Sequence, residues 1–218
     1  MPGYGIEEFV RDSDVSRETC ERLELFADLL NRWNRRVNLV SKESLNDLWR
    51  RHMADSAQLR EVIPPYEGAL IDVGSGAGSP GMVLAIMGLS DIHLIEANAK
   101  KCAFLREAAR ITGASVTIHN IRIARDATPH AALPEAAIVT ARAVSPLANL
   151  LDIVFPIMYD RTCCIFPKGA QADHELREAR RRWKFDVEQV SSKIEPGAVI
   201  LKISHVRRHE ERRDRGLI

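Results

Sequence analysis

The chain lacks most of the features that mark metal-binding, secreted or membrane-spanning proteins. Its cysteines show no CxxC spacing, and the adjacent pair cannot easily share one metal ion or one disulfide. We therefore expect no metal site and reduced, buried thiols at Cys20, Cys102, Cys163 and Cys164. Charge or proline interrupts every apolar run within about ten residues, which predicts no membrane span. The N-terminus lacks the basic start and apolar stretch of a signal peptide, so we expect a cytoplasmic protein.

Aromatic residues and net charge are also scarce. Aromatic residues make up 6% of the chain, and we interpret Trp33, Trp49 and Trp183 as packing residues on helix faces rather than as stacking platforms for bases. The formal net charge is only +1, which gives no overall signature of nucleic-acid binding.

Positive charge is nevertheless concentrated in four runs: Arg32–Arg36, Arg50–His52, Arg177–Lys184 and Arg207–Arg215. A single run of this kind is usually a solvated helix face. Several runs together can form a basic face that grips a phosphate backbone. We expect Arg35 and Arg36 to share one such face with Arg181 and Arg182, and the Arg207–Arg215 stretch is the alternative.

The first 67 residues are expected to be helical. Residues 16–36 carry apolar side chains at helical spacing, with Ser16 as the N-cap. A second helical pattern runs from Ser44 to Val62 and is closed by two prolines. We predict an N-terminal helical extension over residues 1–67, packed on the rest of the chain.

After Gly68, short apolar strands alternate with helices. The expected strands are Ala69–Val73, His93–Glu96, Ser115–Asn120, Ala136–Ala141 and Thr162–Pro167. Expected helices follow at Ser79–Met87, Lys100–Thr112, Leu147–Val154 and Ala172–Trp183, and a closing hairpin at Phe185–Ser191 and Val199–His205. This alternation predicts an α/β fold in which a mostly parallel, twisted sheet carries helices on both faces, with an antiparallel C-terminal hairpin. Residues 68–218 would form this core.

A glycine-rich turn follows the first expected strand and indicates a ligand site. In open α/β sheets, ligands bind at the carboxyl ends of the strands, which is where Gly74, Gly76 and Gly78 fall. Glycine allows a positive φ and leaves no Cβ between the backbone and a ligand. Glu96, about 20 residues further on, can accept hydrogen bonds from ribose hydroxyls.

Asp72 decides which nucleoside ligand the turn favours. A dinucleotide presents an anionic pyrophosphate to the helix N-terminus, and a carboxylate just before the first glycine would repel it. S-adenosylmethionine carries a sulfonium and an ammonium, which a nearby carboxylate stabilises. The residues therefore predict a site for S-adenosylmethionine, and a nicotinamide cofactor remains the alternative.

The ends of the later strands should complete the pocket. Ile123 and Ala124 would flank the adenine. Arg142 sits just past the fourth strand, at the edge of the cleft, where the substrate or the methionine end of the donor must lie. Lys168 has a similar place after the fifth strand.

Several of these segments resemble one known family. They are Trp33-Asn34 with Asn38–Ser41, then Arg51–Ser56 (RHMADS), DVGSGAGSPG, Ala141–Ala143 and Lys168-Gly169. In this order they are similar to the RsmG (GidB) family, over about residues 25 to 205. The resemblance implies a Rossmann-like class I methyltransferase that uses S-adenosylmethionine to methylate N7 of one guanine in bacterial 16S ribosomal RNA. The implied partner is small-subunit rRNA, within a ribonucleoprotein or free of protein, and the protein would act as a monomer.

By position, the resemblance implies donor contacts at Gly74, Ser79, Ile123, Ala124 and Arg142. Two of these positions depart from the family pattern. Position 79 is commonly bulky and apolar in the family, so Ser79 offers the donor less surface. Position 124 is commonly acidic, so the contact at Ala124 is kept if the backbone makes it and is lost if a carboxylate makes it.

The chemistry implied by guanine N7 explains why no catalytic acid or base stands out. N7 has a free lone pair and no proton to lose, so methyl transfer needs positioning rather than a general base. We expect Arg142, Lys168 and Asp55 on the substrate side and structural roles for His52, His93 and His119. The alternatives are a small-molecule methyltransferase on the same fold, a donor-binding module without activity and a nicotinamide-dependent dehydrogenase.

Overall fold

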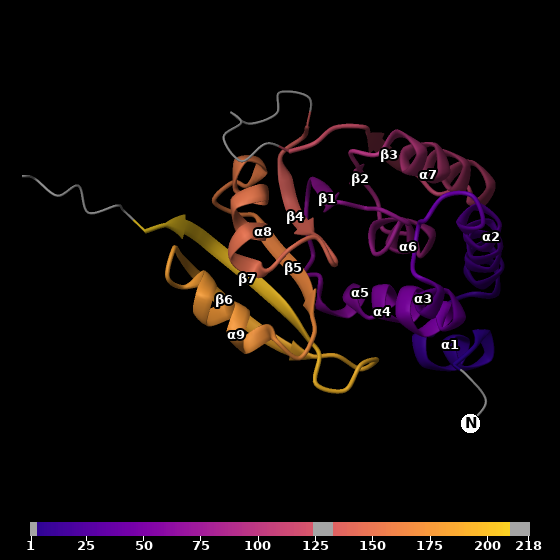
Figure 1. Cartoon of the computed structure of the whole chain (residues 1–218), viewed down its shortest axis with the longest axis horizontal. Coiled ribbons are helices and arrows are strands. Elements are labelled where there is room, and N and C mark those ends of the chain that lie inside the picture. The colour runs from indigo at the N-terminus through magenta and orange to yellow at the C-terminus, as the bar shows by residue number, and fades with distance from the viewer. Residues whose placement is uncertain (1–3, 124–132, 210–218) are drawn as a thin grey trace, which may run out of the picture.

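A computed structural model describes residues 4–123 and 133–209 of the chain. Over these residues one sheet contains seven strands in the order β3-β2-β1-β4-β5-β7-β6 (Figure 1). The strands are β1 (Ala69–Val73), β2 (Ile92–Ile95), β3 (Val116–His119), β4 (Ala136–Thr140), β5 (Cys163–Lys168), β6 (Trp183–Ser191) and β7 (Val199–Arg208). The first five are mutually parallel, β7 is antiparallel to β5, and β6 is antiparallel to β7. This confirms the predicted sheet and C-terminal hairpin.

The order of the strands fixes where a ligand can bind. All five residues of β1 are buried, as expected for a short apolar strand covered on both faces. The chain builds the sheet outward from β1 to β2 and β3, then returns to place β4 on the other side of β1. The order therefore reverses between β1 and β4, and a crevice opens at their carboxyl ends.

Helices cover both faces of the sheet (Figure 1). Those described are α1 (Ile6–Ser13), α2 (Arg17–Asn34), α3 (Lys42–Asn46), the π-helix η1 (Trp49–Ala54), α4 (Asp55–Ala57), α5 (Leu59–Val62), α6 (Gly81–Ile86), α7 (Ala99–Thr112), α8 (Leu147–Val154), the 3₁₀ helix η2 (Phe155–Ile157) and α9 (Ala172–Ala179). One apolar core joins the sheet to α2, α6 and α7, and a second joins the other face to α8 and α9.

The N-terminal helices share the first of these cores with the sheet. Ser16 caps α2, because its Oγ accepts a hydrogen bond from the Thr19 N–H at 3.1 Å, as its sequence position predicts. The ring of Phe26 on α2 lies 6.0 Å from that of Phe104 on α7, and Trp33 meets the same ring edge-on. Trp49 packs on Phe9 with the two rings tilted and their centroids 5.3 Å apart. The structure confirms the interpretation of Trp33 and Trp49 as packing residues.

The helical pattern predicted over Ser44–Val62 is confirmed, but the segment is not one continuous helix. The segment is divided into α3, η1, α4 and α5, because the backbone widens into a π-helix at Trp49–Ala54. π-turns of this kind are frequent at functional sites. Here the turn carries His52 and places it, with Asp55 of the following turn, against Arg142 of another segment. That tertiary contact has no signal in the local helical pattern.

The expected basic helix over Ala172–Trp183 is also too long. It ends at Ala179, and Trp183 begins β6. Trp183 is fully buried against Phe155, with ring centroids 4.9 Å apart, so burial of the indole outweighs the helix propensity of the arginines before it. The interpretation of Trp183 as a packing residue is confirmed, although its element was predicted wrongly. Helix α1 was not predicted.

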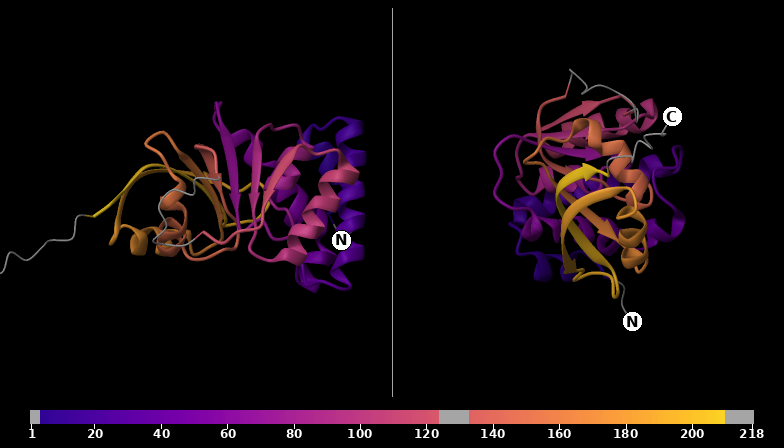
Figure 2. Two further views of the ribbon diagram at one scale, coloured as in Figure 1. Left: turned by 90° about the horizontal axis from the view of Figure 1, so that it is seen from above. Right: turned by 90° about the vertical axis from the view of Figure 1, so that its left-hand side faces the viewer.

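The prediction of one basic face formed by Arg35, Arg36, Arg181 and Arg182 is wrong. Arg35 and Arg36 follow α2, whereas Arg181 and Arg182 precede β6. α2 and the β6–β7 hairpin lie at opposite ends of the molecule in Figure 1 and in the left view of Figure 2. A single continuous face cannot include both pairs.

Among the described residues, no helix combines the length and apolar character that crossing a bilayer requires. The thiols are free, with Cys20, Cys102 and Cys164 buried and Cys163 half-buried, which confirms the predicted burial for three of the four.

Candidate active site

The glycine turn after β1 has the backbone conformation that its sequence predicts. Gly74, Gly76 and Gly78 have φ of 71°, 54° and 89°, values that residues other than glycine rarely adopt. A Cβ on Gly74 would also lie 2.8 Å from Cγ2 of Val144. Gly74 and Gly76 border the cleft, whereas Gly78 faces the protein, where a Cβ would meet Met82 at 2.8 Å. Gly78 is therefore required for packing rather than for ligand approach.

A cleft of about 790 Å³ opens at the carboxyl ends of β1, β4 and β5, where the strand order reverses. This volume is in the range of small-molecule and cofactor sites. Residues of η1, α4 and the turn between β6 and β7 also line the cleft. Its lining includes six of the residues predicted from the sequence: Asp55, Gly74, Gly76, Ser79, Arg142 and Lys168.

Arg142 is the centre of a polar cluster in this cleft. One terminal nitrogen, Nη1, donates to Asp55 Oδ2 at 3.0 Å and to the carbonyl oxygen of Arg51. The other, Nη2, donates to His52 Nδ1 at 2.7 Å. The hydroxyl oxygen of Ser79 lies 3.2 Å from His52 Nδ1. The side chains of Arg142 and Asp55 are only 19% and 21% exposed. The cluster thus joins the end of β4 to η1, α4 and the glycine turn.

His52 must be neutral in this cluster. A guanidinium can only donate, so Nδ1 accepts and the ring proton resides on Nε2. Burial, reinforced by the charges of Arg142 and Arg51, lowers the pKa of His52 from 6.5 to about 3. Nε2 is buried and has no hydrogen-bond partner among the described residues. His52 is therefore a fixed neutral group near pH 7 and cannot act there as a proton donor derived from imidazolium.

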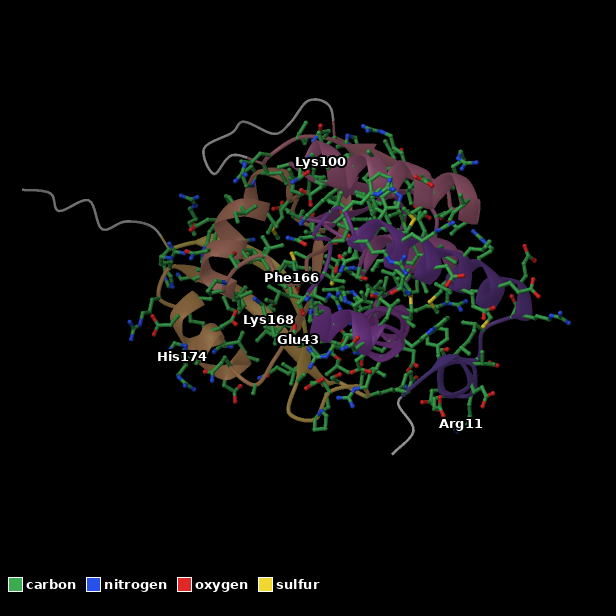
Figure 3. All side chains as sticks on the ribbon, turned by 45° about the vertical axis from the view of Figure 1, so that its right-hand side comes forward. Arg11, Glu43, Lys100, Phe166, Lys168 and His174 are labelled. Carbon is green, nitrogen blue, oxygen red and sulfur yellow. The ribbon has the colours of Figure 1, made fainter. Side chains whose placement is uncertain are left out.

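Lys168 lies near the middle of the molecule, at the end of β5 (Figure 3). Its ammonium forms an ion pair with Glu175 at 2.8 Å and donates to the carbonyl oxygen of Ser145 at 3.0 Å. Glu175 also accepts from the Leu147 N–H at 2.7 Å, at the start of α8. Lys168 thus borders the cleft, but its charge is already paired, and it braces the segment that follows Arg142.

Asp72 does not have the position that the sequence argument requires. The side chain is fully buried beneath the glycine turn and is not among the residues that line the cleft. Its Oδ2 accepts from the Gly81 N–H at 3.2 Å, and Oδ1 has no partner among the described residues. Burial raises the pKa of Asp72 from 3.8 to about 6. The expectation that this carboxylate faces a cationic ligand is not met, and Asp72 instead holds the start of α6.

Glu96 ties the glycine turn to the next helix. Its Oε2 accepts from the Gly76 N–H at 3.0 Å, and its Oε1 accepts from the Asn98 N–H at 2.7 Å. Each carboxylate oxygen has a second lone pair, which leaves it able to accept a further hydrogen bond. Ile123 is buried after β3, and Ala124 lies outside the described residues. Glu96 and Ile123 are not part of the cleft lining.

Several residues of the site were not assigned a role from the sequence. His52 was expected to be structural, but its contacts with Arg142 and Ser79 tie it to the site. Asn34 shapes one wall, because its Oδ1 accepts from the N–H groups of Leu39 and Val40 at 2.9 and 3.0 Å. The WN and NLxS segments that carry the family resemblance were the available signal for this wall.

Gln58 was missed entirely. Its amide nitrogen donates to Asp55 Oδ1 at 2.9 Å and to Ser192 Oγ at 3.2 Å, and its oxygen accepts from the Lys193 N–H at 2.9 Å. Gln58 therefore holds the β6–β7 turn against the carboxylate that pairs with Arg142. No local pattern in the sequence links positions 58 and 192.

Comparisons with known proteins cover almost the whole chain. A family model, GidB, described as rRNA small subunit methyltransferase G, matches residues 19–199. A ribosomal RNA small subunit methyltransferase G from Paramagnetospirillum magneticum is 46% identical over 94% of this chain and 97% of its own. Its counterpart from Rhodospirillum rubrum is 45% identical over 93% and 98%.

Solved structures resemble the chain in fold alone. A mutant of MtNAS in complex with S-adenosylmethionine has a TM-score of 0.54 and 12% identity, and the match covers 92% of this chain and 84% of that one. The glycopeptide N-methyltransferase MtfA complexed with S-adenosylmethionine has a TM-score of 0.51 and 10% identity, with coverage of 70% and 93%.

Proposed function

The chain belongs to the family of rRNA small subunit methyltransferase G (GidB), and from this premise we propose that it methylates N7 of a specific guanine in bacterial 16S ribosomal RNA. The observation that carries the proposal is the cleft at the β1–β4 crevice, where the glycine turn meets the Arg142 cluster. The family match spans the segments that form both walls of this cleft.

The methyl donor that we propose is S-adenosylmethionine, with S-adenosylhomocysteine as the product. Gly74 and Gly76 present bare backbone to the cleft, and Ser79 and Arg142 border it. Glu96 accepts a hydrogen bond from the turn at Gly76, and Ile123 shares an apolar core with Val73 at the end of β1. Both would hold the nucleoside together with Ala124. Asp72 and Gly78 would act from beneath by holding the turn in shape. When bound, the donor supplies an electrophilic methyl group.

The protein residues would act by positioning. Guanine N7 attacks with a lone pair and releases no proton, so no general base is needed. The groups of the cleft fit this requirement, because His52 is held neutral and the charges of Arg142 and Lys168 are paired with Asp55 and Glu175. Arg142, Asp55 and Lys168 would shape the substrate side and align N7 with the methyl group. We assign no catalytic acid or base.

Residues 1–67 would serve as a helical extension of the methyltransferase core formed by residues 68–218, since both contribute side chains to one apolar core. The protein would act as a cytoplasmic monomer on small-subunit rRNA, either free of protein or within a ribonucleoprotein.

The direct test is transfer of a labelled methyl group in vitro. Purified protein is incubated with labelled S-adenosylmethionine and either 16S rRNA, small-subunit particles or a panel of small-molecule acceptors. We expect label in RNA as 7-methylguanosine, identified by mass spectrometry of the nucleosides. Label only in a small molecule would favour a small-molecule methyltransferase on the same fold. Binding of the donor without transfer to any acceptor would favour a binding module.

A further inference from the structure

The β6–β7 hairpin brings two of the basic runs together at its open end. The turn at its other end lines the cleft. Trp183 pairs with Arg208, and Lys184 pairs with Arg207, in the antiparallel register of β6 and β7. The backbone N–H of His209 also donates to the carbonyl oxygen of Arg182 at 3.0 Å. We define the hairpin-end patch as Arg180, Arg181, Arg182, Lys184, Arg207 and Arg208, all of which are exposed.

This patch is far from the cleft. Val199, which lines the cleft, begins β7 opposite Lys168, and Arg208 ends the same strand. A strand of this length spans roughly 30 Å at the rise of an antiparallel strand. Figure 1 shows the end of β7 and the start of β6 on one side of the molecule, beyond α8 and α9.

The positive charge of the patch exceeds the negative charge that contacts it. Arg181 pairs with Glu178, and Arg182 and Arg208 share Asp152, at 2.9 and 3.9 Å. Among the described residues, Lys184 and Arg207 form no ion pair with a carboxylate. Residues 210–218 add three arginines and three acidic residues, so they do not change the balance of charge.

Two features set this patch apart from an ordinary solvated run. Lys184 and Arg207 are directly opposite each other, and like charges in that arrangement destabilise an antiparallel pair. Two guanidinium groups are held in place by aromatic rings, Arg208 at 5.1 Å from the Trp183 ring and Arg180 at 5.7 Å from Phe185. Stacked arginines lose less conformational entropy when they bind a phosphate. The hairpin thus keeps Lys184 and Arg207 together despite their mutual repulsion. Stacking on aromatic rings restrains two further cations, Arg180 and Arg208, in the same patch.

We propose that the hairpin-end patch binds phosphates of the ribosomal RNA substrate, roughly 30 Å from the cleft in which methyl transfer takes place. The inference rests on the proposed function and extends it: the enzyme holds its RNA at a second point, away from the methylated base. RNA fits better than a protein partner, because the patch offers several separate cations and few apolar side chains. A short RNA that carries only the target segment would not reach the patch.

The test compares two neutralised variants that lose the same charge. Lys184→Gln with Arg207→Gln removes the facing pair, whereas Arg11→Gln with Arg17→Gln removes two exposed cations at the other end of the chain. Binding of protein-free 16S rRNA is measured against salt concentration in the absence of methyl donor. Methylation is measured separately on 16S rRNA and on a short stem-loop with the target segment.

We expect the hairpin variant to flatten the log–log salt slope by about one to two units, since each lost contact contributes roughly 0.7 on single strands and 0.9 on duplex. Its kcat/KM should fall several-fold on 16S rRNA and stay unchanged on the stem-loop, and donor binding should be unaffected. Its unfolding midpoint should not fall, because the substitution relieves a repulsion. The Arg11/Arg17 control should leave the salt slope and both substrates unchanged.

Three results would overturn the inference. An unchanged salt slope in the hairpin variant would assign the patch to solvation or to protection of the edge strand. An equal loss in the control would indicate a general effect of net charge. A loss seen with small-subunit particles but not with protein-free rRNA would identify a ribosomal protein as the partner. Wild-type protein that binds 16S rRNA through the patch but methylates nothing would contradict the proposed function and leave this inference standing.

Discussion

At the scale of single residues, the site depends on how Arg142 is held. Its guanidinium makes hydrogen bonds to Asp55, His52 and a backbone carbonyl, and four-fifths of its side chain is withdrawn from solvent. A charge in such a position needs its partners, because removing one leaves the other poorly solvated. Asp55 is the only carboxylate among the described residues that pairs with Arg142.

Asp55→Ala should therefore lower the free energy of unfolding by about 1–3 kcal/mol, the range for leaving a buried hydrogen-bonding group unsatisfied. It should also reduce methyl transfer, because Arg142 loses its orientation. The control is Asp47→Ala, which breaks longer and more exposed ion pairs with Arg50 and Arg51 and should change stability by less than about 1 kcal/mol. Urea denaturation measures both. Equal losses in the two variants would show that Asp55 does not support Arg142.

His52 predicts a dependence of stability on pH. Its folded-state pKa of about 3 is below the ordinary 6.5, so the unfolded chain binds a proton more readily. The contribution of His52 to stability is thus fully present above pH 6.5 and is lost as pH falls toward 3, by at most about 1.4 kcal/mol per pH unit. His52→Asn should lose less stability than the wild type over that window. The exposed His174→Asn should follow the wild type, and an identical fall for all three proteins would be inconsistent with a neutral, buried His52 (Figure 3).

Asp72 predicts a dependence of stability on pH that is opposite in sign to that of His52. Its raised pKa, about 6 against 3.8, means that the folded protein binds the proton more tightly. The associated stability is present below pH 4 and is lost as pH rises through 6. Asp72→Asn should therefore gain stability relative to the wild type between pH 4 and pH 8, by up to about 3 kcal/mol. Calorimetry at several pH values measures the difference, with the exposed Asp173→Asn as control. A difference in stability between Asp72→Asn and the wild type that does not change from pH 4 to pH 8 would refute the raised pKa of Asp72.

At the scale of elements, the parallel strands follow the sequence closely and the segment before them does not. Buried parallel strands are continuous apolar runs bounded by turns, so β1 and β4 could be predicted to within a residue. The helix over Leu147–Val154 was predicted with its correct ends. The π-helix η1 and the early end of α9 depend on contacts with Arg142 and on burial of Trp183, which local propensity does not encode.

The turn between β6 and β7 is held in place in part by the side chain of Gln58. Gln58 joins it to Asp55 through hydrogen bonds to Ser192 and Lys193. Gln58→Ala should speed hydrogen exchange of the amides over residues 192–198 and raise the KM for RNA more than it lowers kcat, because this turn closes the cleft. Glu195→Gln, which removes only an exposed pair with Arg50, is the matched control. Unchanged exchange in the Gln58 variant would contradict this role.

At the scale of the whole molecule, the sequence was sufficient for the fold and the family but not for the arrangement of charge. Six predicted residues line the cleft, since strand ends in a parallel sheet must meet at one edge. Asp72 precedes the same turn, yet its side chain points beneath it, and sequence position alone does not distinguish the two sides. The basic runs could be identified but not grouped, because only the register of β6 and β7 brings residues 180–184 and 207–208 together.

Methyl transfer to N7 of a guanine in 16S rRNA is the activity on which the roles of the cleft residues depend. It is tested most directly by mass spectrometry of 16S rRNA nucleosides from a strain in which the gene is deleted and then restored. We expect that one 7-methylguanosine is lost on deletion, that the wild-type gene restores it, and that Gly74→Val does not, because a side chain there would clash with Val144. An unchanged content of 7-methylguanosine in the 16S rRNA of the deletion strain would contradict the account.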